Sequence, residues 1–395
     1  MRSFLLATYL FLTSFIPLAQ TEEGKSILLK PDRVFDGEEM HEDWVVLIKG
    51  EEIEDVGKSG GLKIPEGTEI MELPGMTVLP GLIEGHAHLL LYPYNQTPWN
   101  DQVLKESEAL RVARATVHAE KTLMAGFTSI RDLGTEGAGY ADVGIKLAIE
   151  EGIIPGPRMM ICTRAIVATG SYGPKGFRPD YDVPLGAEPA DAQNLVKVVR
   201  DQIGKGADFI KVYADYRWGP EGEARPTFSL EELKLIVETA KSSGREVAAH
   251  AVTPEAITRA VKAGVISIEH GDGATPEVLQ LMKQNNVTLC PTLGAVDAIW
   301  QYFYGWDKEK DPDPEIIQLK KQTFSNAIKT GVTLCAGGDV GVYPHGDNVR
   351  ELELMVDYGM KPMDVLRSAT SINARMMGDR WKIGQLKQGY WADVI

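Results

Sequence analysis

Residues 229–290 read SLEELKLIVETAKSSGREVAAHAVTPEAITRAVKAGVISIEHGDGATPEVLQLMKQNNVTLC. In this stretch, segments with the apolar spacing of helices alternate with short apolar segments typical of buried strands. Ser229 and Glu232 form a capping box for the first helix, Gly244 ends it, and Thr-Pro pairs begin the next two helices. The pattern indicates repeated β/α units, and therefore a parallel sheet covered by helices.

Extending the same reading along the chain gives eight candidate strands. They lie in LIEGHAH, FTSIRD, RMMICTRAI, FIKVY, EVAAHA, VISIEHG, VTLCPTL and VTLCAGGD. Eight consecutive β/α units predict an α/β fold, a (β/α)8 TIM barrel over residues 83–375, with an active site at the carboxyl ends of its strands. Short β-type segments in residues 20–82, together with the returning segment 376–395, predict a small β-sandwich beside the barrel.

The chain begins with the pattern of a secretory signal peptide. Arg2 is followed by an apolar stretch that ends at Ala19 and is shorter than the roughly 20 residues that a membrane-spanning helix needs. We therefore expect residues 1–19 to be a cleaved signal peptide, and the mature protein to be exported to the periplasm without a membrane anchor. Three cysteines in 395 residues cannot form a disulfide framework, which suits a large periplasmic enzyme.

The composition restricts the possible partners. Hydrophobic residues make up 44% of the chain and charged residues 25%, which is typical of a globular protein with a full core. The net charge is −15, so no basic field exists to attract phosphate backbones, and nucleic acid is not an expected partner. We expect a small-molecule substrate. The sequence leaves open whether the protein forms a homo-oligomer.

Polar residues gather at the predicted ends of the barrel strands. His86 and His88 are two apart on the first strand, so both side chains leave the same face and can bind one ion. His250 ends the fifth strand, His270 the sixth and Asp339 the eighth. A single histidine after an apolar strand is more often a hydrogen-bonded core residue. The joint occurrence of these four histidines and Asp339 at one mouth of the barrel indicates a metal site.

Lys211 lies within the fourth strand, between Ile210 and Val212. A charged lysine on a buried strand has a large desolvation cost unless it is paired or modified. One solution is reaction with carbon dioxide to give a lysine carbamate, whose oxygens can bridge two cations. The alternative is an ion pair with a nearby aspartate or glutamate.

Together these residues resemble the amidohydrolase superfamily. The stretches GMTVLPGLIEGHAHL, GFTSIRDLG, GADFIKVYAD and SIEHGDG are most similar to its binuclear-metal branch of Xaa-Pro dipeptidases and imidazolonepropionase-related enzymes. That branch acts on dipeptides and N-acyl amino acids, and some of its members hydrolyse ochratoxin. Relatives continue with further strands after the equivalent of Ala392, so the resemblance implies a truncated sandwich here.

The resemblance implies a role for each candidate ligand. His86, His88 and Asp339 would hold the more buried of two divalent cations, and the histidines that end the fifth and sixth strands would hold the other. Lys211, as N6-carboxylysine, would bridge them. Zinc is the default ion for such nitrogen and carboxylate ligands. The implied reaction is that of a metallo-dipeptidase or carboxypeptidase, in which a metal-bridging hydroxide attacks the amide carbonyl and Asp339 serves as general base and then as general acid.

Substrate contacts are predicted in the loops beyond the strands, because a free carboxylate on the substrate would need a cationic or hydroxyl partner. The candidates are Tyr172, Tyr213, Tyr216, Arg217 and His345. Tryptophans in the same loops, Trp99 among them, could add an apolar wall, although packing is the alternative explanation.

Two other functions stay open. One is a mononuclear-type deaminase or a cyclic-amide (imidazolone) hydrolase on a related scaffold, although a site with a single metal has no use for Lys211 as a bridge. The other is a noncatalytic binding protein on the same fold, although such proteins usually lose ligands. The number of metal ions per chain would distinguish a mononuclear-type enzyme from a binuclear one. An absence of hydrolysis with metals bound would favour the noncatalytic binding protein.

Overall fold

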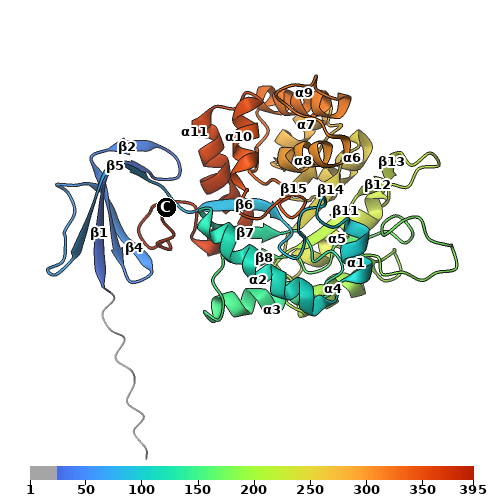
Figure 1. Cartoon of the computed structure of the whole chain (residues 1–395), viewed down its shortest axis with the longest axis horizontal. Coiled ribbons are helices and arrows are strands. Elements are labelled where there is room, and N and C mark those ends of the chain that lie inside the picture. The colour runs from blue at the N-terminus through green and yellow to red at the C-terminus, as the bar shows by residue number, and fades with distance from the viewer. Residues whose placement is uncertain (1–24) are drawn as a thin grey trace, which may run out of the picture.

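The computed structural model describes residues 25–395, so the predicted signal peptide, residues 1–19, lies outside the described residues. Figure 1 shows a small sheet beside a larger assembly of strands and helices. The small sheet consists of β1 (Ser26–Phe35), β2 (Met40–Glu42), β3 (Trp44–Lys49), β4 (Glu52–Lys58) and β5 (Glu69–Val78). In it, β1 pairs antiparallel with β2 and β3 and parallel with β5, and β3 pairs antiparallel with β4.

The C-terminal segment contacts this sheet. The N–H of Ile53 donates to the carbonyl of Tyr390 at 2.8 Å, and Leu79 and Ile395 exchange backbone hydrogen bonds of 3.0 Å. Leu386 belongs to the apolar cluster under the sheet. The unit predicted as a β-sandwich is thus one five-stranded sheet to which the last residues of the chain are joined.

The strands of the larger part form the barrel. They are β6 (Leu82–Ala87), β7 (Phe127–Asp132), β8 (Arg158–Ile161), β11 (Ile210–Tyr213), β14 (Val247–Ala251), β15 (Ser267–His270) and β16 (Thr288–Cys290). Parallel pairing joins neighbouring strands in two groups, β6-β7-β8 and β11-β14-β15-β16. Between the two groups, the N–H of Asp208 donates to the carbonyl of Ile161 at 2.8 Å. Nearly all residues of these strands are buried, as expected for a parallel sheet covered by helices. The predicted (β/α)8 TIM barrel is confirmed.

The predicted eighth strand, residues 332–339, is the least regular. The barrel closes here through two isolated parallel bridges, one from Leu334 to β16 and one from Val340, the next residue after this segment, to β6. Glycine permits this close approach, since a Cβ on Gly337 would lie 2.5 Å from the backbone nitrogen of His86. The N–H of Asp339 then donates to the carbonyl of His86 at 2.9 Å. This contact places the acidic residue directly beside the first strand.

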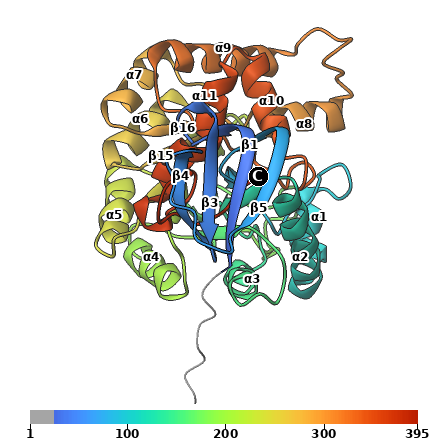
Figure 2. The ribbon, with the colours of Figure 1, turned by 90° about the vertical axis from the view of Figure 1, so that its left-hand side faces the viewer.

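Helices surround the barrel, and Figure 2 shows them as a ring behind the small sheet. They are α1 (Trp99–Lys105), α2 (Glu108–Met124), α3 (Ala141–Glu150), α4 (Leu195–Gly204), α5 (Leu230–Lys241), α6 (Pro254–Ala263), α7 (Pro276–Gln284), α8 (Leu293–Tyr304), α9 (Glu315–Thr330), α10 (Val349–Asp357), α11 (Pro362–Arg367) and α12 (Asn373–Met377). The predicted capping box of Ser229 and Glu232 starts α5, and Thr253 and Thr275 cap α6 and α7. Within residues 25–395, no helix is long and apolar enough to span a membrane.

Shorter elements lie between these strands and helices. They are β9 (Ile166–Val167), β10 (Glu188–Pro189), β12 (Asp215–Arg217), β13 (Ala224–Pro226), the π-helical turn Ser368–Ile372 and the 3₁₀ turn Asp379–Trp381. β9 pairs with β10 and β11, whereas β12 and β13 form an antiparallel hairpin. The hairpin follows β11 directly, so it extends from the carboxyl end of that strand.

Candidate metal centre

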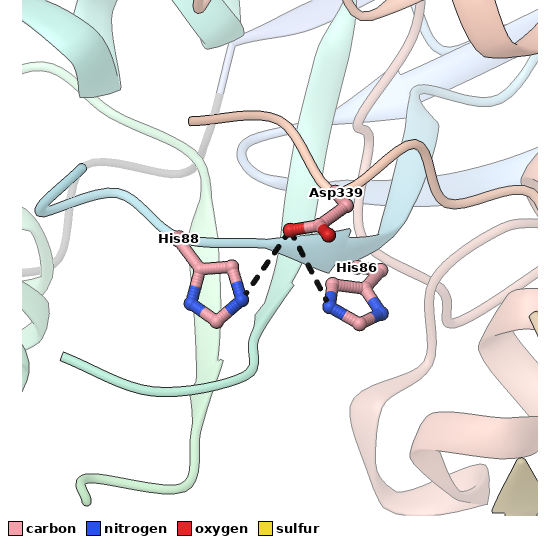
Figure 3. Close-up of side chains that lie close together, drawn as sticks. All are labelled: His86, His88 and Asp339. Atoms are coloured by element: carbon pink, nitrogen blue, oxygen red, sulfur yellow. Dashed lines mark ion pairs between the residues drawn. The ribbon is translucent and has the colours of Figure 1, made fainter. Parts of the chain in front are cut away.

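His86, His88 and Asp339 meet at the carboxyl end of β6. Figure 3 shows the three side chains pointing toward one another. Asp339 Oδ1 lies 3.7 Å from His86 Nε2 and 3.4 Å from His88 Nε2. One potential ligand atom from each residue lies within 4.8 Å of the others, so a single cation can contact all three side chains.

The other two predicted histidines continue this group. The ring of His270, at the end of β15, has its centroid 5.2 Å from that of His86 and 4.5 Å from that of His250 on β14. Burial lowers the pKa of His86 to about 4 and the pKa values of His250 and His270 well below the usual range. These three rings are therefore neutral at pH 7, which is the form that binds a metal ion.

Lys211 lies on β11, opposite Ala248 of β14 in the parallel register. It is only 1% exposed, and burial lowers the pKa of its amine. The negative charge of Glu269 is the largest influence that raises this pKa, but Glu269 is already paired with Arg131 at 2.6 Å. Among the described residues, no carboxylate forms an ion pair with Lys211. The ion-pair alternative for this lysine therefore lacks a partner.

Each of the first two histidines uses one ring nitrogen for a hydrogen bond. His86 Nδ1 donates to Glu269 Oε2 at 2.8 Å, and His88 Nδ1 donates to the carbonyl of Gly134 at 2.8 Å. These bonds turn the two Nε2 atoms toward Asp339. Hydrogen bonds of this kind orient metal-binding histidines and raise the basicity of the ligating nitrogen.

The later two histidines have a similar arrangement. His270 Nδ1 lies 2.7 Å from Thr292 Oγ1, which leaves its Nε2 for a cation. His250 Nε2 lies 3.6 Å from Asp215 Oδ1, while its Nδ1 is buried without a hydrogen-bond partner. A buried ring nitrogen without a partner costs free energy, and a bound cation would remove that cost. The nitrogen and carboxylate donors present here fit a divalent cation such as zinc.

Backbone strain is concentrated at this end of the barrel. Glu136, Thr163, His270, Thr292 and Asp339 have φ angles of 47°, 64°, 74°, 49° and 63°. All five lie at or just after the end of a barrel strand, and residues other than glycine rarely adopt this left-handed conformation. Strain of this kind persists where the surrounding structure fixes it, and it is common at functional sites.

Glu269 connects His86 to a buried arginine, and both residues escaped identification from the sequence. Arg131 donates to Glu269 Oε1 at 2.6 Å and to Ser267 Oγ at 2.9 Å, and the side chains of Arg131 and Glu269 are both fully buried. Burial alone would raise the pKa of Glu269, but Arg131 beside it holds that pKa well below its usual range. The available signal was an acidic residue inside the apolar strand VISIEHG, immediately before His270.

We expect Glu269→Gln to weaken metal binding by roughly 10- to 100-fold, because His86 loses the carboxylate that orients it. The free energy of unfolding should also fall by about 3–5 kcal/mol, since Arg131 would keep a buried charge without its partner. A competition titration with a coloured chelator and denaturant unfolding measure the two effects. Glu255→Gln is the matched control, because Glu255 pairs with Arg259 on the surface of α6. Unchanged metal affinity in Glu269→Gln would contradict this role.

Three of the five predicted substrate contacts lie together beside His250. The ring of Tyr213 stacks on that of His250 with centroids 4.6 Å apart. The ring centroid of Tyr172 lies 4.7 Å from the centroids of both Tyr213 and Tyr216. Trp99 packs against Tyr172 at 5.4 Å. We call Trp99, Tyr172, Tyr213 and Tyr216 the aromatic cluster. It adjoins the predicted metal ligands directly.

The other two predicted substrate contacts have different surroundings. Arg217 follows Tyr216 on β12 and is exposed. His345 is buried, with its ring stacked on His118 at 4.5 Å and its Nε2 donating to the carbonyl of Leu91 at 3.2 Å. This ring is packed against α2 and bonded to the backbone, and a contact between His345 and substrate stays a prediction.

Comparisons with known proteins agree with this fold. The model of the amidohydrolase family matches residues 77–395. Ochratoxinase from Aspergillus niger is 32% identical over 346 residues, which cover 80% of this chain and 69% of that protein. A solved Xaa-Pro dipeptidase with methionine bound in its active site is 30% identical with a TM-score of 0.81, covering 94% of this chain and 93% of that one. A prolidase complexed with N-methylphosphonate-L-proline is 27% identical with a TM-score of 0.81, covering 94% and 92%. With most of its length matched at these identities, and with the same barrel, this chain belongs to the amidohydrolase family.

Proposed function

We propose that this protein is a metal-dependent hydrolase that cleaves the amide bond of dipeptides or N-acyl amino acids. The observation that carries the proposal is the meeting of His86, His88 and Asp339 at the carboxyl end of β6, with the rings of His250 and His270 beside them. The similar proteins support the substrate class, because they include an ochratoxinase, a Xaa-Pro dipeptidase and a prolidase. The ligands named for two of those structures, methionine and N-methylphosphonate-L-proline, both contain an amino acid.

We further propose that the site takes two divalent cations, with zinc as the default. His86, His88 and Asp339 would hold one cation, and the histidines of β14 and β15 would hold the other. Lys211, carboxylated on its amine, would supply oxygen atoms to both. Its burial without an ion-pair partner supports this role, since the carbamate would convert an unpaired cation into a ligand.

The cations, when bound, would make water nucleophilic at neutral pH and would polarise the scissile carbonyl. Asp339 is placed to move the proton. Its side chain is 13% exposed whereas that of His86 is 1% exposed, so its carboxylate can meet a water molecule at the mouth of the barrel. We expect this carboxylate to accept a proton from the attacking water and to return it to the leaving nitrogen as the C–N bond breaks.

The test is a screen of the zinc-loaded protein against N-acyl amino acids and dipeptides, with X-Pro and X-Phe included. We expect release of the free amino acid, measured by mass spectrometry. A chelator should abolish this release, and added zinc should restore it, because the proposed reaction depends on the cations to activate water. If no member of the panel is cleaved while metal is bound, the hydrolase proposal fails and a noncatalytic binding protein is favoured.

A further inference from the structure

A buried carboxylate lies at the centre of the aromatic cluster. Glu136 follows β7 and is only 3% exposed. Its Oε2 accepts hydrogen bonds from the hydroxyl of Tyr172 at 2.6 Å and from Nε1 of Trp99 at 2.9 Å. Its Oε1 accepts only a long bond of 3.4 Å, from the hydroxyl of Tyr213. One oxygen of this carboxylate therefore keeps most of its capacity to accept another donor.

The carboxylate and the rings share one location beside the predicted metal ligands. Tyr213 donates to Glu136 and also stacks on His250, so a single side chain separates the carboxylate from that ring. Tyr216 is the tyrosine of the cluster that is only partly buried, and its ring lies 5.9 Å from Tyr213 and 6.2 Å from His250. A substrate group that reaches past Tyr216 would meet π faces and a negative charge.

The positive charges near this carboxylate do not form an ion pair with it. Among the described residues, no lysine or arginine lies within ion-pair distance of the Glu136 side chain, although Arg111 is near enough for the two charges to attract each other. Arg111 is the guanidinium on this side, but it donates to backbone carbonyls, that of Glu136 at 2.6 Å and those of Leu90 and Thr135 at 3.0–3.2 Å. Arg217 is exposed on the β12 hairpin. The cluster therefore offers attraction to a cation and repulsion to a carboxylate.

We propose that Glu136 determines substrate specificity, and that the aromatic cluster receives a primary ammonium or guanidinium group of the substrate rather than its carboxylate. This inference rests on the proposed function, because it names the group that accompanies the scissile amide. The sequence suggested the opposite for these tyrosines, namely contact with a free carboxylate. The cation has two possible sources in a dipeptide, either a lysine or arginine side chain or an unblocked α-amino group.

The test compares matched substrates of the zinc-loaded full chain. Ala-Lys, Ala-norleucine and Ala-Glu differ in the charge of one side chain, and each is used with a free and with an acetylated amino terminus. We expect kcat/KM for Ala-Lys to exceed that for Ala-norleucine by roughly tenfold, with Ala-Glu lowest, if the side chain is the cation. If the α-amino group is the cation, the same advantage should separate free from acetylated Ala-norleucine.

Three variants show whether the charge of Glu136 carries this selectivity. Glu136→Gln keeps the size of the side chain, and it should reduce the preference for the cation to near unity. Tyr172→Phe removes one hydrogen bond but leaves the charge, so the preference should persist even if overall rates fall. Glu238→Gln, on the exposed face of α5, should retain wild-type selectivity. Near-ultraviolet circular dichroism confirms that each variant is folded.

Calorimetry with lysine, norleucine and glutamate, each with a free and with an acetylated α-amino group, gives a second measurement that does not need turnover. Tighter binding to the wild type of the compounds that carry the extra cation, either the side-chain amine of lysine or the free α-amino group, would support the inference if it is lost in Glu136→Gln. Hydrolysis of all substrates at equal rates, or a cation preference that survives in Glu136→Gln, would overturn it while leaving the proposed function intact. Lack of hydrolysis of every substrate would instead remove the proposed function, and the calorimetric order would still decide whether Glu136 selects a cation.

Discussion

The Asp339→Asn variant is expected to lose amide hydrolysis by roughly 10²- to 10⁴-fold in kcat, while it keeps most of its bound metal. The amide oxygen of asparagine can still face His86 and His88, as Oδ1 of the carboxylate does at 3.7 and 3.4 Å. Asparagine also tolerates the left-handed backbone, and the φ of this residue is 63°. What asparagine cannot do is accept a proton from water and return it to the leaving amine.

Two measurements on one preparation test this expectation. Elemental analysis gives the metal content per chain, and the rate at saturating substrate gives kcat. Asp357→Asn is a suitable control, since Asp357 is exposed at the end of α10 and lies outside the metal centre. Near wild-type turnover in Asp339→Asn would remove Asp339 from proton transfer. Loss of both metal and activity would show instead that the carboxylate acts mainly as a ligand.

The barrel could be predicted because local signals and global fold agree in this chain. The capping box at Ser229 and the Thr-Pro starts of α6 and α7 are contacts within one turn, so the sequence alone specifies them. The alternation of strands and helices then fixes which ends of the strands face the same way. For this reason His250 and His270 could be expected beside His86, although about 160 to 180 residues separate them along the chain.

Contacts between loops could not be predicted in the same way. Glu136 lies four residues beyond β7, and its position among the tyrosines depends on a strained φ of 47° and on bonds to Trp99 at the start of α1 and to Tyr172 in another loop. The surroundings of His345 could not be predicted either. It follows a barrel strand, which suggested a role at the mouth, but stacking on His118 of α2 turns its ring into the packed interior. Strand order does not specify which way a loop turns.

The Lys211→Ala variant is expected to lose most of its bound metal and to recover it when a short carboxylic acid is supplied. In the proposed site, carbon dioxide would add to the neutral amine of Lys211 with release of a proton, and the carbamate would supply oxygen ligands for the cations. Burial already lowers the pKa of this amine, which favours the nucleophilic form. Alanine removes the bridge and leaves a space about as long as the lysine side chain. Formate, acetate or propionate can occupy that space and supply the missing oxygens.

Lys211→Met is the matched control for this rescue. Methionine is nearly as long as lysine, so it fills the same space and leaves no room for an added acid. Both variants should therefore be folded and poor in metal, but only Lys211→Ala should regain metal and activity as the acid concentration rises. Elemental analysis of the wild type should give two metals per chain, whereas one metal would favour a mononuclear deaminase or cyclic-amide hydrolase. A full complement of metal in Lys211→Ala without added acid would contradict the carbamate, because the bridge would then be dispensable for holding the cations together.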